Sequence, residues 1–395
     1  MTNESQFFKD HLGQTSPFPF MIEVESATGA YIYDKNGKAY LDMIAGVAVN
    51  NIGHRHPKVV AALSAQLEKH LHVMVYGEFI QDAQQNLVRQ LLSVLPASLD
   101  GVYVVNSGTE AIEAALKLAK RATGRTEFVA FKGSYHGSTH GAMSVSANEV
   151  KKIAFRPLLP DVRFLPHNDC AALEQITTRT AGVIMETIQG DAGVRRPSAA
   201  FMQALRARCT EVGALLILDE IQCGMGRAGS MFAFEQFDIV PDLLTLGKAL
   251  GGGMPIGALV AAQQHLQLFT HAPMLGHITT FGGHPMVCAA AAATIEVLKS
   301  EIEWATLEQR AAAFAAQIAA HPAVRAHRRS GAMFAFDLAS ADEVEKVVQY
   351  CLEQGLLTFW FLSHPYSFRL SPPLNLAQAD WDKAAQIIKS ALDHL

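Results

Sequence analysis

The stretch Asp242-Leu-Leu-Thr-Leu-Gly-Lys-Ala-Leu-Gly-Gly-Gly253 places Lys248 directly after a short apolar run, and an earlier run, Leu215-Leu-Ile-Leu-Asp-Glu220, ends in Asp219. Each run has the length and apolar character of a buried strand. A lysine just past a strand can form a Schiff base with an aldehyde cofactor, and an aspartate past a neighbouring strand can keep a pyridinium nitrogen protonated. The pair points to pyridoxal phosphate (PLP), although either residue alone is more often a surface charge or a cap.

Seven short apolar runs alternate with helical stretches in the middle of the chain. The runs are 102–105, 127–131, 162–165, 182–186, 214–218, 243–246 and 257–261. Continuous apolar strands separated by helices predict an α/β fold with a seven-stranded, mainly parallel sheet and helices on both faces. Ligands of such sheets collect beyond the carboxyl ends of the strands. Polar candidates follow five of the strands there: Ser107, Tyr135, Glu186, Asp219 and Lys248.

The two chain ends have a different pattern from this central sheet. Residues 20–42 alternate apolar and polar positions around Gly29 and the turn Asp34-Lys-Asn-Gly37, which predicts a β-hairpin. After about residue 295 amphipathic helices and short strands follow. We therefore expect a smaller α/β domain built from residues 1–55 and 295–395, beside a large PLP-binding domain over residues 56–294.

Composition disfavours several classes of protein. The chain has 395 residues, of which 50% are hydrophobic, and its net charge of −5 comes without a basic run, so we expect no nucleic-acid binding. No stretch has the roughly 18 apolar residues of a membrane helix, and the N-terminus lacks a signal-peptide pattern, which favours a cytoplasmic protein with no membrane contact. The five cysteines are spaced like reduced thiols, and the sixteen histidines lack partners at metal-ligand spacings, so we expect no metal site.

A candidate phosphate site follows the first strand of the sheet. The segment Asn106-Ser-Gly-Thr-Glu110 opens a helix whose apolar positions keep a 3.6-residue period until Gly124. A helix N-terminus offers free N–H groups and the positive end of a dipole, and hydroxyls add donors. An ordinary N-cap is the better explanation of this segment taken alone. Its position one strand away from the Asp219 and Lys248 pair favours a phosphate site instead.

These motifs resemble those of a known family along nearly the whole chain. The most specific match is the block Leu215–Gly253, and Gly53-His-Arg-His-Pro57, Gly133-Ser-Tyr-His-Gly137 and Thr279-Thr-Phe-Gly-Gly-His-Pro285 support it. The chain resembles class III (ω-type) aminotransferases of PLP fold type I, and is similar to the acetylornithine, ornithine and 4-aminobutyrate aminotransferases. The resemblance implies a homodimer with shared active sites that moves an amino group from an amino acid or ω-amine to a 2-oxo acid by a ping-pong mechanism.

The resemblance also implies roles for individual residues. Lys248 would hold the cofactor and shuttle the proton, and Asp219 would pair with the pyridine nitrogen. The remaining cofactor contacts that it implies are Ser107, Gly108, Thr109 and, across the dimer interface, Thr280 for the phosphate, Tyr135 and Ile221 for the two ring faces, Gln222 and Glu186 for the ring oxygen, and His136. Core packing is an equally good explanation of Tyr135 and Ile221, and a turn hydroxyl is the alternative for Thr280.

The substrate-binding residues depart from the family pattern. Arg369, in Phe-Arg-Leu-Ser-Pro-Pro, matches the family's carboxylate-binding arginine, and a planar guanidinium suits a carboxylate. A glutamate can mask that arginine in the family, and here the shorter Asp191 stands in its place. Ornithine-like members carry an arginine where this chain has Ser138, which removes a second carboxylate clamp. We expect Tyr76 to line the substrate pocket, and the substrate itself stays open.

Two alternatives remain beside aminotransfer. A racemase, aminomutase or decarboxylase would use the same cofactor residues and differ in which Cα bond lies perpendicular to the ring. A requirement for an oxo acid distinguishes them from an aminotransferase. A catalytically silent interaction protein of this fold is disfavoured because Lys248, Asp219 and Gln222 are all present.

Overall fold

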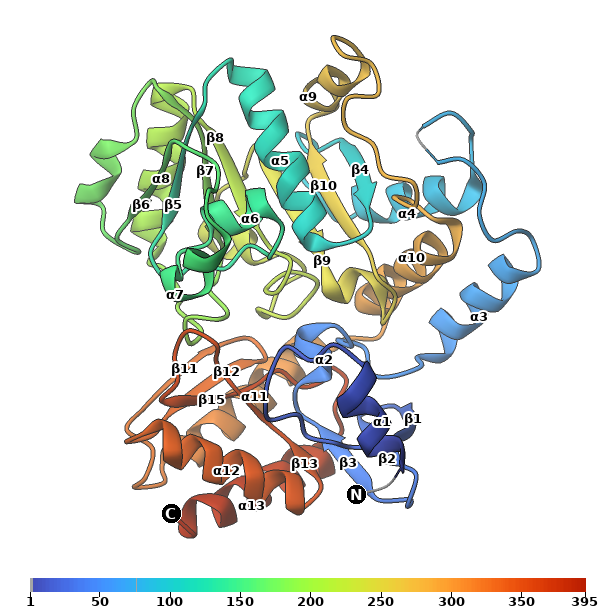
Figure 1. Cartoon of the computed structure of the whole chain (residues 1–395), viewed down its shortest axis with the longest axis vertical. Helices are drawn as coiled ribbons and strands as arrows, with labels where there is room; N and C mark the ends of the chain where they lie inside the picture. The colour runs from blue at the N-terminus through green and yellow to red at the C-terminus, as the bar shows by residue number, and fades with distance from the viewer. Residues whose placement is uncertain (1–2, 76) are drawn as a thin grey trace.

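The computed structural model describes residues 3–75 and 77–395 and has a seven-stranded sheet at its centre (Figure 1). The strands are β4 (Gly101–Val105), β5 (Glu127–Phe131), β6 (Val162–Leu165), β7 (Thr180–Glu186), β8 (Leu215–Asp219), β9 (Leu243–Gly247) and β10 (Gly257–Ala261). Their order across the sheet is β4-β10-β9-β8-β7-β5-β6. Only β10 runs antiparallel to its neighbours, β4 and β9. The predicted mainly parallel sheet is therefore confirmed.

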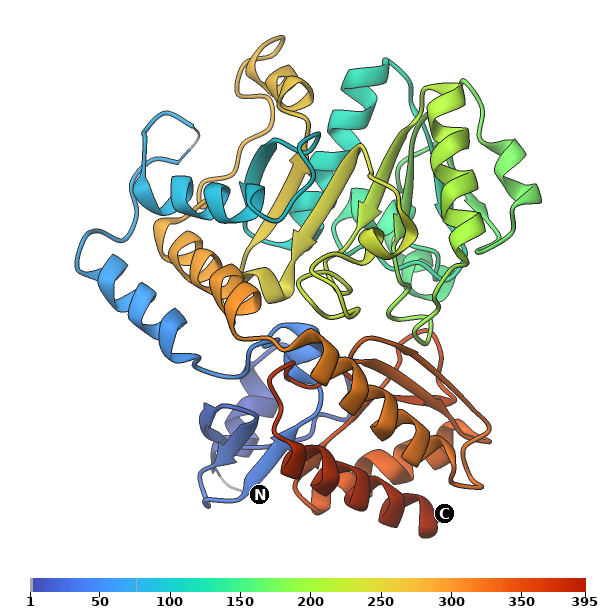
Figure 2. The ribbon, with the colours of Figure 1, turned by 180° about the vertical axis from the view of Figure 1, so that it is seen from behind.

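Helices cover both faces of this sheet, which explains why most residues of its strands are apolar. Helix α5 (Gly108–Thr123) lies in front of the sheet in Figure 1, and α8 (Ala199–Val212) covers the opposite face, which Figure 2 turns towards the viewer. Helix α5 buries a stripe that includes Ile112, Leu116 and Ala119. It begins after Ser107, whose hydroxyl accepts the Glu110 N–H, and ends at Gly124 with a φ of 69°.

Further helices surround the edge of the sheet that carries β4. Helix α10 (Pro285–Ser300) packs against α3 (Pro57–Leu67) and α4 (Asp82–Leu92). The short helices α6 (His140–Val145) and α7 (Glu149–Lys152) lie in the connection between β5 and β6, and α9 (Gln263–Leu266) follows β10. No helix among residues 3–75 and 77–395 combines the length and the apolar character needed to cross a bilayer.

The smaller domain lies below the large sheet in Figure 1 and contains both chain ends. Its first sheet has the order β1-β2-β3-β13, with β1 (Val24–Thr28), β2 (Tyr31–Asp34), β3 (Ala39–Asp42) and β13 (Leu356–Leu357). Its second sheet has the order β11-β12-β15-β14, with β11 (Ala326–Ser330), β12 (Met333–Asp337), β14 (Phe359–Trp360) and β15 (Ser367–Leu370). The hairpin predicted at residues 20–42 corresponds to β1, β2 and β3. Strand β3 pairs in parallel with β13, so this domain joins distant parts of the chain.

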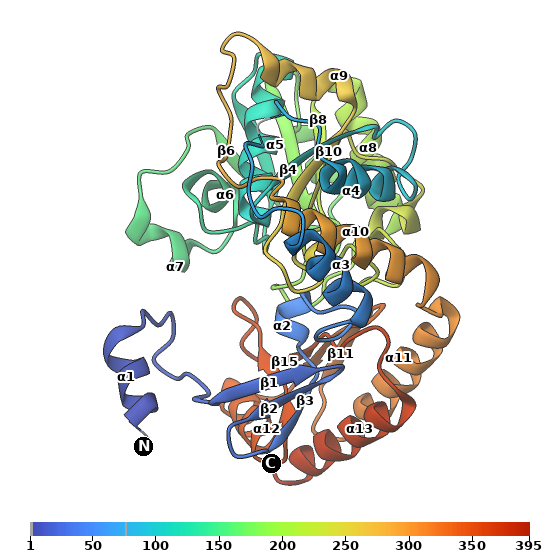
Figure 3. The same cartoon turned by 90° about the vertical axis from the view of Figure 1, so that its right-hand side faces the viewer.

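The helices of the smaller domain are α11 (Trp304–Ala319), α12 (Ala341–Glu353) and α13 (Gln378–Asp393), with the short α2 (Ala45–Ala48) next to the large domain. Trp381 of α13 is buried against the rings of Phe314 and Phe334, at centroid distances of 5.0 and 5.9 Å. Burial of each such side chain contributes roughly 1.5–3 kcal/mol. Helix α1 (Asn3–His11) projects away from the rest of the fold (Figure 3).

A buried arginine, Arg227, joins the two domains. Arg227 is fully buried and donates to the Ala332 and Pro372 carbonyls and to Asn51 Oδ1. Burial, together with the smaller effect of the nearby Arg369 charge, lowers the pKa of Arg227 to about 9. Because carbonyl and amide oxygens from three separate segments accept its N–H groups, Arg227 fixes the smaller domain against the loop that follows β8.

Candidate active site

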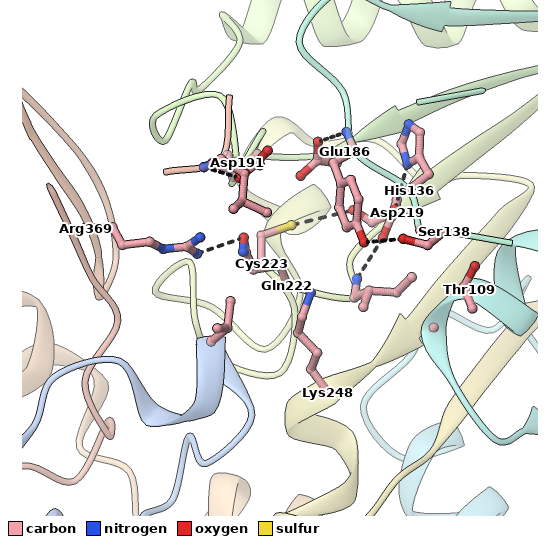
Figure 4. A pocket seen from close by; sticks show the side chains of 17 residues that line it. Thr109, His136, Ser138, Glu186, Asp191, Asp219, Gln222, Cys223, Lys248 and Arg369 are labelled. Carbon is pink, nitrogen blue, oxygen red and sulfur yellow. Dashed lines mark hydrogen bonds and ion pairs between the residues drawn. The ribbon is translucent and has the colours of Figure 1, made fainter. Parts of the chain in front are cut away.

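A cavity of about 320 Å³ opens where strands β7, β8 and β9 end (Figure 4). Four of the five residues predicted at strand ends line it: Tyr135, Glu186, Asp219 and Lys248. The fifth, Ser107, caps helix α5 directly before the lining residue Gly108. The carboxyl edge of the sheet thus gathers these side chains as the strand pattern predicts.

Asp219 is held in one orientation by two hydrogen bonds. Its Oδ2 lies 2.7 Å from His136 Nδ1, and its Oδ1 accepts the Ile221 N–H at 3.0 Å. Both Asp219 and His136 are buried, and His136 Nε2 has no partner within the described part of the chain. A buried carboxylate fixed in this way can hold a protonated ring nitrogen in the cavity.

Lys248 points into the same cavity from the end of β9 (Figure 4). Burial lowers the pKa of its ammonium group, an effect that the nearby Asp219 carboxylate partly opposes. A lowered pKa increases the share of neutral amine, which is the nucleophilic form. The backbone of Lys248 has a φ of 43°, a conformation that side chains rarely adopt and that often occurs at functional sites.

Two glycines let the backbone approach the end of helix α5. A Cβ on Gly108 would lie 2.8 Å from Ile221 Cδ1, and a Cβ on Gly137, whose φ is 131°, would lie 2.3 Å from Thr109 Oγ1. The first N–H groups of a helix have no intrahelical acceptor. The N-terminus of α5 at the cavity wall therefore fits a phosphate, and with Lys248 and Asp219 the cavity fits PLP.

The hydroxyl of Thr109 is already committed to the protein. Glu113 accepts hydrogen bonds from the Thr139 hydroxyl and from the N–H groups of Gly141 and Ala142. Because a carboxylate only accepts, the Thr139 proton points to Glu113, and Thr109 must donate in its 2.8 Å contact with Thr139. The backbone N–H of Thr109 is left for a phosphate. Glu113, which the sequence did not single out, fixes the 137–142 segment beside the phosphate site.

We expect Thr109→Ala to retain its affinity for PLP. Since the hydroxyl bonds Thr139, the variant should lose stability worth about 0.5–1.5 kcal/mol, while the dissociation constant of PLP changes less than about threefold. Chemical denaturation and PLP titration of the cofactor-free protein measure the two quantities, and Thr139→Val should resemble Thr109→Ala in stability. Tenfold weaker PLP binding at unchanged stability would instead show that the hydroxyl contacts the phosphate.

A hydrogen bond from its backbone N–H holds Tyr135 at the cavity wall. Glu186 accepts the N–H groups of Tyr135 and Gly190, both at 2.9 Å. Burial raises the pKa of Glu186 to about 7. The Tyr135 hydroxyl lies 3.2 Å from Ser138 Oγ, so the residue at the position of the missing family arginine contacts the ring that we expect to cover the cofactor.

Arg369 enters the cavity from strand β15 of the smaller domain (Figure 4). It is 6% exposed, lies over the Phe361 ring at 4.9 Å and donates a 3.4 Å hydrogen bond to Gln222 Oε1. Burial lowers its pKa, an effect that the charges of Asp191 and Glu186 oppose. No carboxylate of the described residues lies within ion-pair distance of its guanidinium, so its N–H groups remain available to a substrate carboxylate.

Not every predicted residue lies in the cavity. Thr280 is exposed and is not among the residues that line it, and Tyr76 lies outside the described residues. Four apolar residues that line the cavity were not predicted from the sequence: Val47, Ile188, Cys223 and Leu362. Val47 and Leu362 carry no local signal, because only the packing of the smaller domain brings them to the sheet edge. No group of three or more metal-ligating side chains occurs in residues 3–75 and 77–395.

Comparisons with known proteins agree with this geometry. Residues 13–392 match the model of the family "Aminotransferase class-III". The chain is 37% identical over 386 residues to the acetylornithine aminotransferase of Methanopyrus kandleri, covering 97% of both chains. It is 36% identical over 378 residues to that of Bacillus subtilis, covering 94% of this chain and 95% of the relative.

Solved structures give the same result. The ornithine aminotransferase of Toxoplasma gondii superimposes with a TM-score of 0.92 at 28% identity, covering 100% of this chain and 96% of that chain. Another structure of that enzyme, with partial occupancy of PLP at its active site, has a TM-score of 0.91 at 28% identity and covers 98% of this chain and 93% of that one. The chain therefore belongs to the class III aminotransferases, a family of PLP-dependent transaminases.

Proposed function

We propose that the protein moves the amino group of an amino acid or ω-amine to a 2-oxo acid by a ping-pong mechanism, like the acetylornithine and ornithine aminotransferases that it resembles. The observation that carries the proposal is the presence in one cavity of the Lys248 amine, the fixed Asp219 carboxylate and the unpaired Arg369 guanidinium. Bound PLP supplies an electron sink for negative charge on the substrate carbon. The groups that bind the substrate carboxylate would differ from those of the family, because Ser138 replaces an arginine and Asp191 replaces a glutamate.

The chain would hold the cofactor from several sides. Ser107, Gly108 and Thr109 at the N-terminus of α5 would bind the phosphate. The cavity walls formed by Tyr135 and Ile221 would enclose the ring. Gln222 and Glu186 would lie at the ring oxygen, with Asp219 at the ring nitrogen and His136 orienting Asp219 through its 2.7 Å contact.

Lys248 would move the proton between the substrate carbon and the cofactor. Its lowered pKa increases the share of the neutral amine, which is the form that accepts a proton. Arg369 would orient the oxo acid by pairing with its carboxylate, and its burial excludes the water that would weaken that pair. These roles define a site that both reacting molecules occupy in turn.

A panel of half-reactions tests the proposed function. Ornithine, N-acetylornithine, 4-aminobutyrate and glutamate are added singly to the PLP-loaded enzyme, and the visible spectrum is followed. A true donor should change the spectrum without an oxo acid, and pyruvate or 2-oxoglutarate should restore it. Continuous turnover in the absence of any oxo acid would show a racemase, aminomutase or decarboxylase instead.

We further propose that two copies of the chain share their active sites. Exposed apolar side chains occur on two segments: Leu67, Leu71, Met74, Phe79 and Ile80 on the first, and Met274, Leu275, Ile278 and Phe281 on the second. The two segments adjoin, because the rings of His72 and Phe281 are 5.0 Å apart. Such a patch favours a protein interface. Thr280 lies within it, which supports donation of its hydroxyl to the phosphate site of the partner.

Mixing two inactive variants tests the shared site. In a heterodimer of Lys248→Ala and Thr280→Ala chains, one site has both residues intact if Thr280 acts across the interface. That heterodimer should recover roughly half of the wild-type cofactor retention and turnover, since one of its two sites is complete. Verified heterodimers that regain nothing over the parent variants would place Thr280 in its own chain's site or outside both sites.

The proposed location is the cytoplasm. All five cysteines are free thiols, and four of them are buried. Unpaired buried thiols are typical of proteins in reducing compartments. The small-molecule donor and acceptor are the only partners that the proposed reaction requires besides the second copy.

A further inference from the structure

A hydrogen-bonded bridge crosses between the domains at the cavity mouth. Asp191 follows strand β7 of the large sheet, and residues 361–364 follow strand β14 of the smaller domain. Asp191 Oδ1 accepts the Leu362 N–H at 3.0 Å (Figure 4), and its Oδ2 accepts the Ser363 hydroxyl at 2.7 Å. Asp191 is 5% exposed, so these bonds are shielded from water.

A third residue completes this bridge. Because the Ser363 hydroxyl donates its proton to Asp191, its oxygen is free to accept, and it accepts from Asn148 Nδ2 at 3.1 Å. Asn148 belongs to the connection between β5 and β6 of the large sheet. We name this set of residues the latch: Asn148, Asp191, Leu362 and Ser363. The latch joins two connections of the large sheet to one segment of the smaller domain.

A second set of contacts holds the same two segments together. Arg328 of β11 donates its Nε–H to the Gly193 carbonyl, two residues after Asp191, and forms a bidentate pair with Asp337 at 2.6 and 2.7 Å. His364 Nε2 lies 3.1 Å from Asp337 Oδ1. A Cβ on Gly193 would lie 2.9 Å from the His364 ring, which shows how closely the segments approach. The latch therefore lies beside a second set of contacts between the same two segments.

The latch engages the carboxylate whose charge acts most strongly on Arg369, that of Asp191. Both oxygens of Asp191 are used by Leu362 and Ser363, and Asp191 forms no ion pair with Arg369. Its charge still acts on Arg369, since it is the leading influence that raises the pKa of the guanidinium against the effect of burial. Asp191 therefore favours the charged form of Arg369 without covering its N–H groups.

The same latch positions an apolar side chain at the cavity mouth. Leu362 lines the cavity although its side chain remains 52% exposed, and its backbone is fixed by Asp191. Directly before it, Phe361 lies beneath the Arg369 guanidinium. A substrate carboxylate at Arg369 would therefore meet an apolar wall formed by the latched segment.

We propose that Asp191 is a positioning residue that latches the 361–364 segment and leaves Arg369 open at all times, so that the enzyme selects substrates whose reacting carbon carries a carboxylate. The inference rests on the proposed aminotransfer. A donor without that carboxylate would exclude water from the Arg369 guanidinium without supplying an anion in its place, which is costly. A donor with it needs to displace no internal carboxylate.

Donor preference tests the proposal. In wild type, kcat/KM for glutamate should exceed that for 4-aminobutyrate by about tenfold or more, the effect of one charge-assisted hydrogen bond. Asp191→Glu, whose longer side chain reaches towards Arg369, should reduce this ratio by about tenfold, through a higher KM for glutamate and 2-oxoglutarate rather than a lower kcat. Asp382→Asn, an exposed change on α13, is the control and should keep the wild-type ratio.

Hydrogen exchange gives a readout that is independent of activity. In PLP-loaded Asp191→Ala, the Leu362 amide should exchange about tenfold faster than in wild type, because its acceptor is gone, while Asp382→Asn leaves it unchanged. Unchanged exchange at Leu362, or a wild-type enzyme that prefers 4-aminobutyrate, would overturn the proposal while the proposed function stands. Absence of transfer from every donor would instead refute the proposed function, and the exchange measurement would still decide whether Asp191 latches the segment.

Discussion

Replacement of Lys248 by alanine should lower turnover by about 10³-fold or more, because one residue both holds the cofactor and carries the proton. Lys248 is the lysine that lines the cavity beside Asp219. Borohydride reduction of the wild-type holoenzyme followed by peptide mapping should find PLP on Lys248. The visible band of the bound cofactor should shift in the variant, since PLP would then be held without a covalent bond to a lysine.

Two controls accompany this prediction. Lys389→Ala, an exposed lysine on α13, should leave the turnover and the band unchanged. Methylamine added to Lys248→Ala should restore part of the turnover, because a free amine can replace the missing proton carrier. Labelling of a different lysine in the wild-type protein, or turnover above about a tenth of wild type in Lys248→Ala, would contradict the assignment.

The substitution Asp219→Asn should retain PLP but slow proton removal from the donor by about 10²–10³-fold. Asparagine has the size of aspartate without the charge that keeps a ring nitrogen protonated. Stopped-flow half-reactions with a saturating donor measure the rate, and PLP titration measures the affinity. The loss should be confined to the rate, since the phosphate site at α5 is unchanged.

Comparison with two further variants sharpens this test. His136→Phe removes the 2.7 Å contact to Asp219 and should slow the same step by a smaller factor, about tenfold, because the charge remains but its orientation is lost. Asp238→Asn, an exposed acidic residue of positive φ that asparagine tolerates, should have no effect. A wild-type rate in Asp219→Asn would show that this carboxylate does not act on the ring nitrogen.

The strand-end residues could be predicted because their positions follow from local pattern. Each apolar run formed a strand of the sheet. Parallel strands present their carboxyl ends at one edge, so Glu186, Asp219 and Lys248 were expected to meet there. The antiparallel direction of β10 could also have been predicted from the sequence. The connection from Gly247 to Gly257 is too short for the dozen or more residues that a parallel crossover needs.

The latch and the Glu113 contacts could not be predicted in the same way. Asp191 and Leu362 are 171 residues apart in the chain, and their contact depends on how the two domains pack. Glu113 lies in a helical stretch where its spacing fits an ordinary exposed position, and only the fold brings Thr139 to it. Periodicity describes one element at a time, whereas these contacts arise between elements.

The parallel pairing of β3 with β13 has a consequence for synthesis of the chain. Asp42 lies opposite Leu357, so the first strands leave the ribosome roughly 300 residues before the strand that completes their sheet. At a typical elongation rate of about 5–20 residues per second, the edge of β3 waits roughly 15–60 s for its partner. An unpaired edge exposed for that time can join other chains. We therefore expect chaperones to protect the N-terminal hairpin of the nascent protein until β13 has been made.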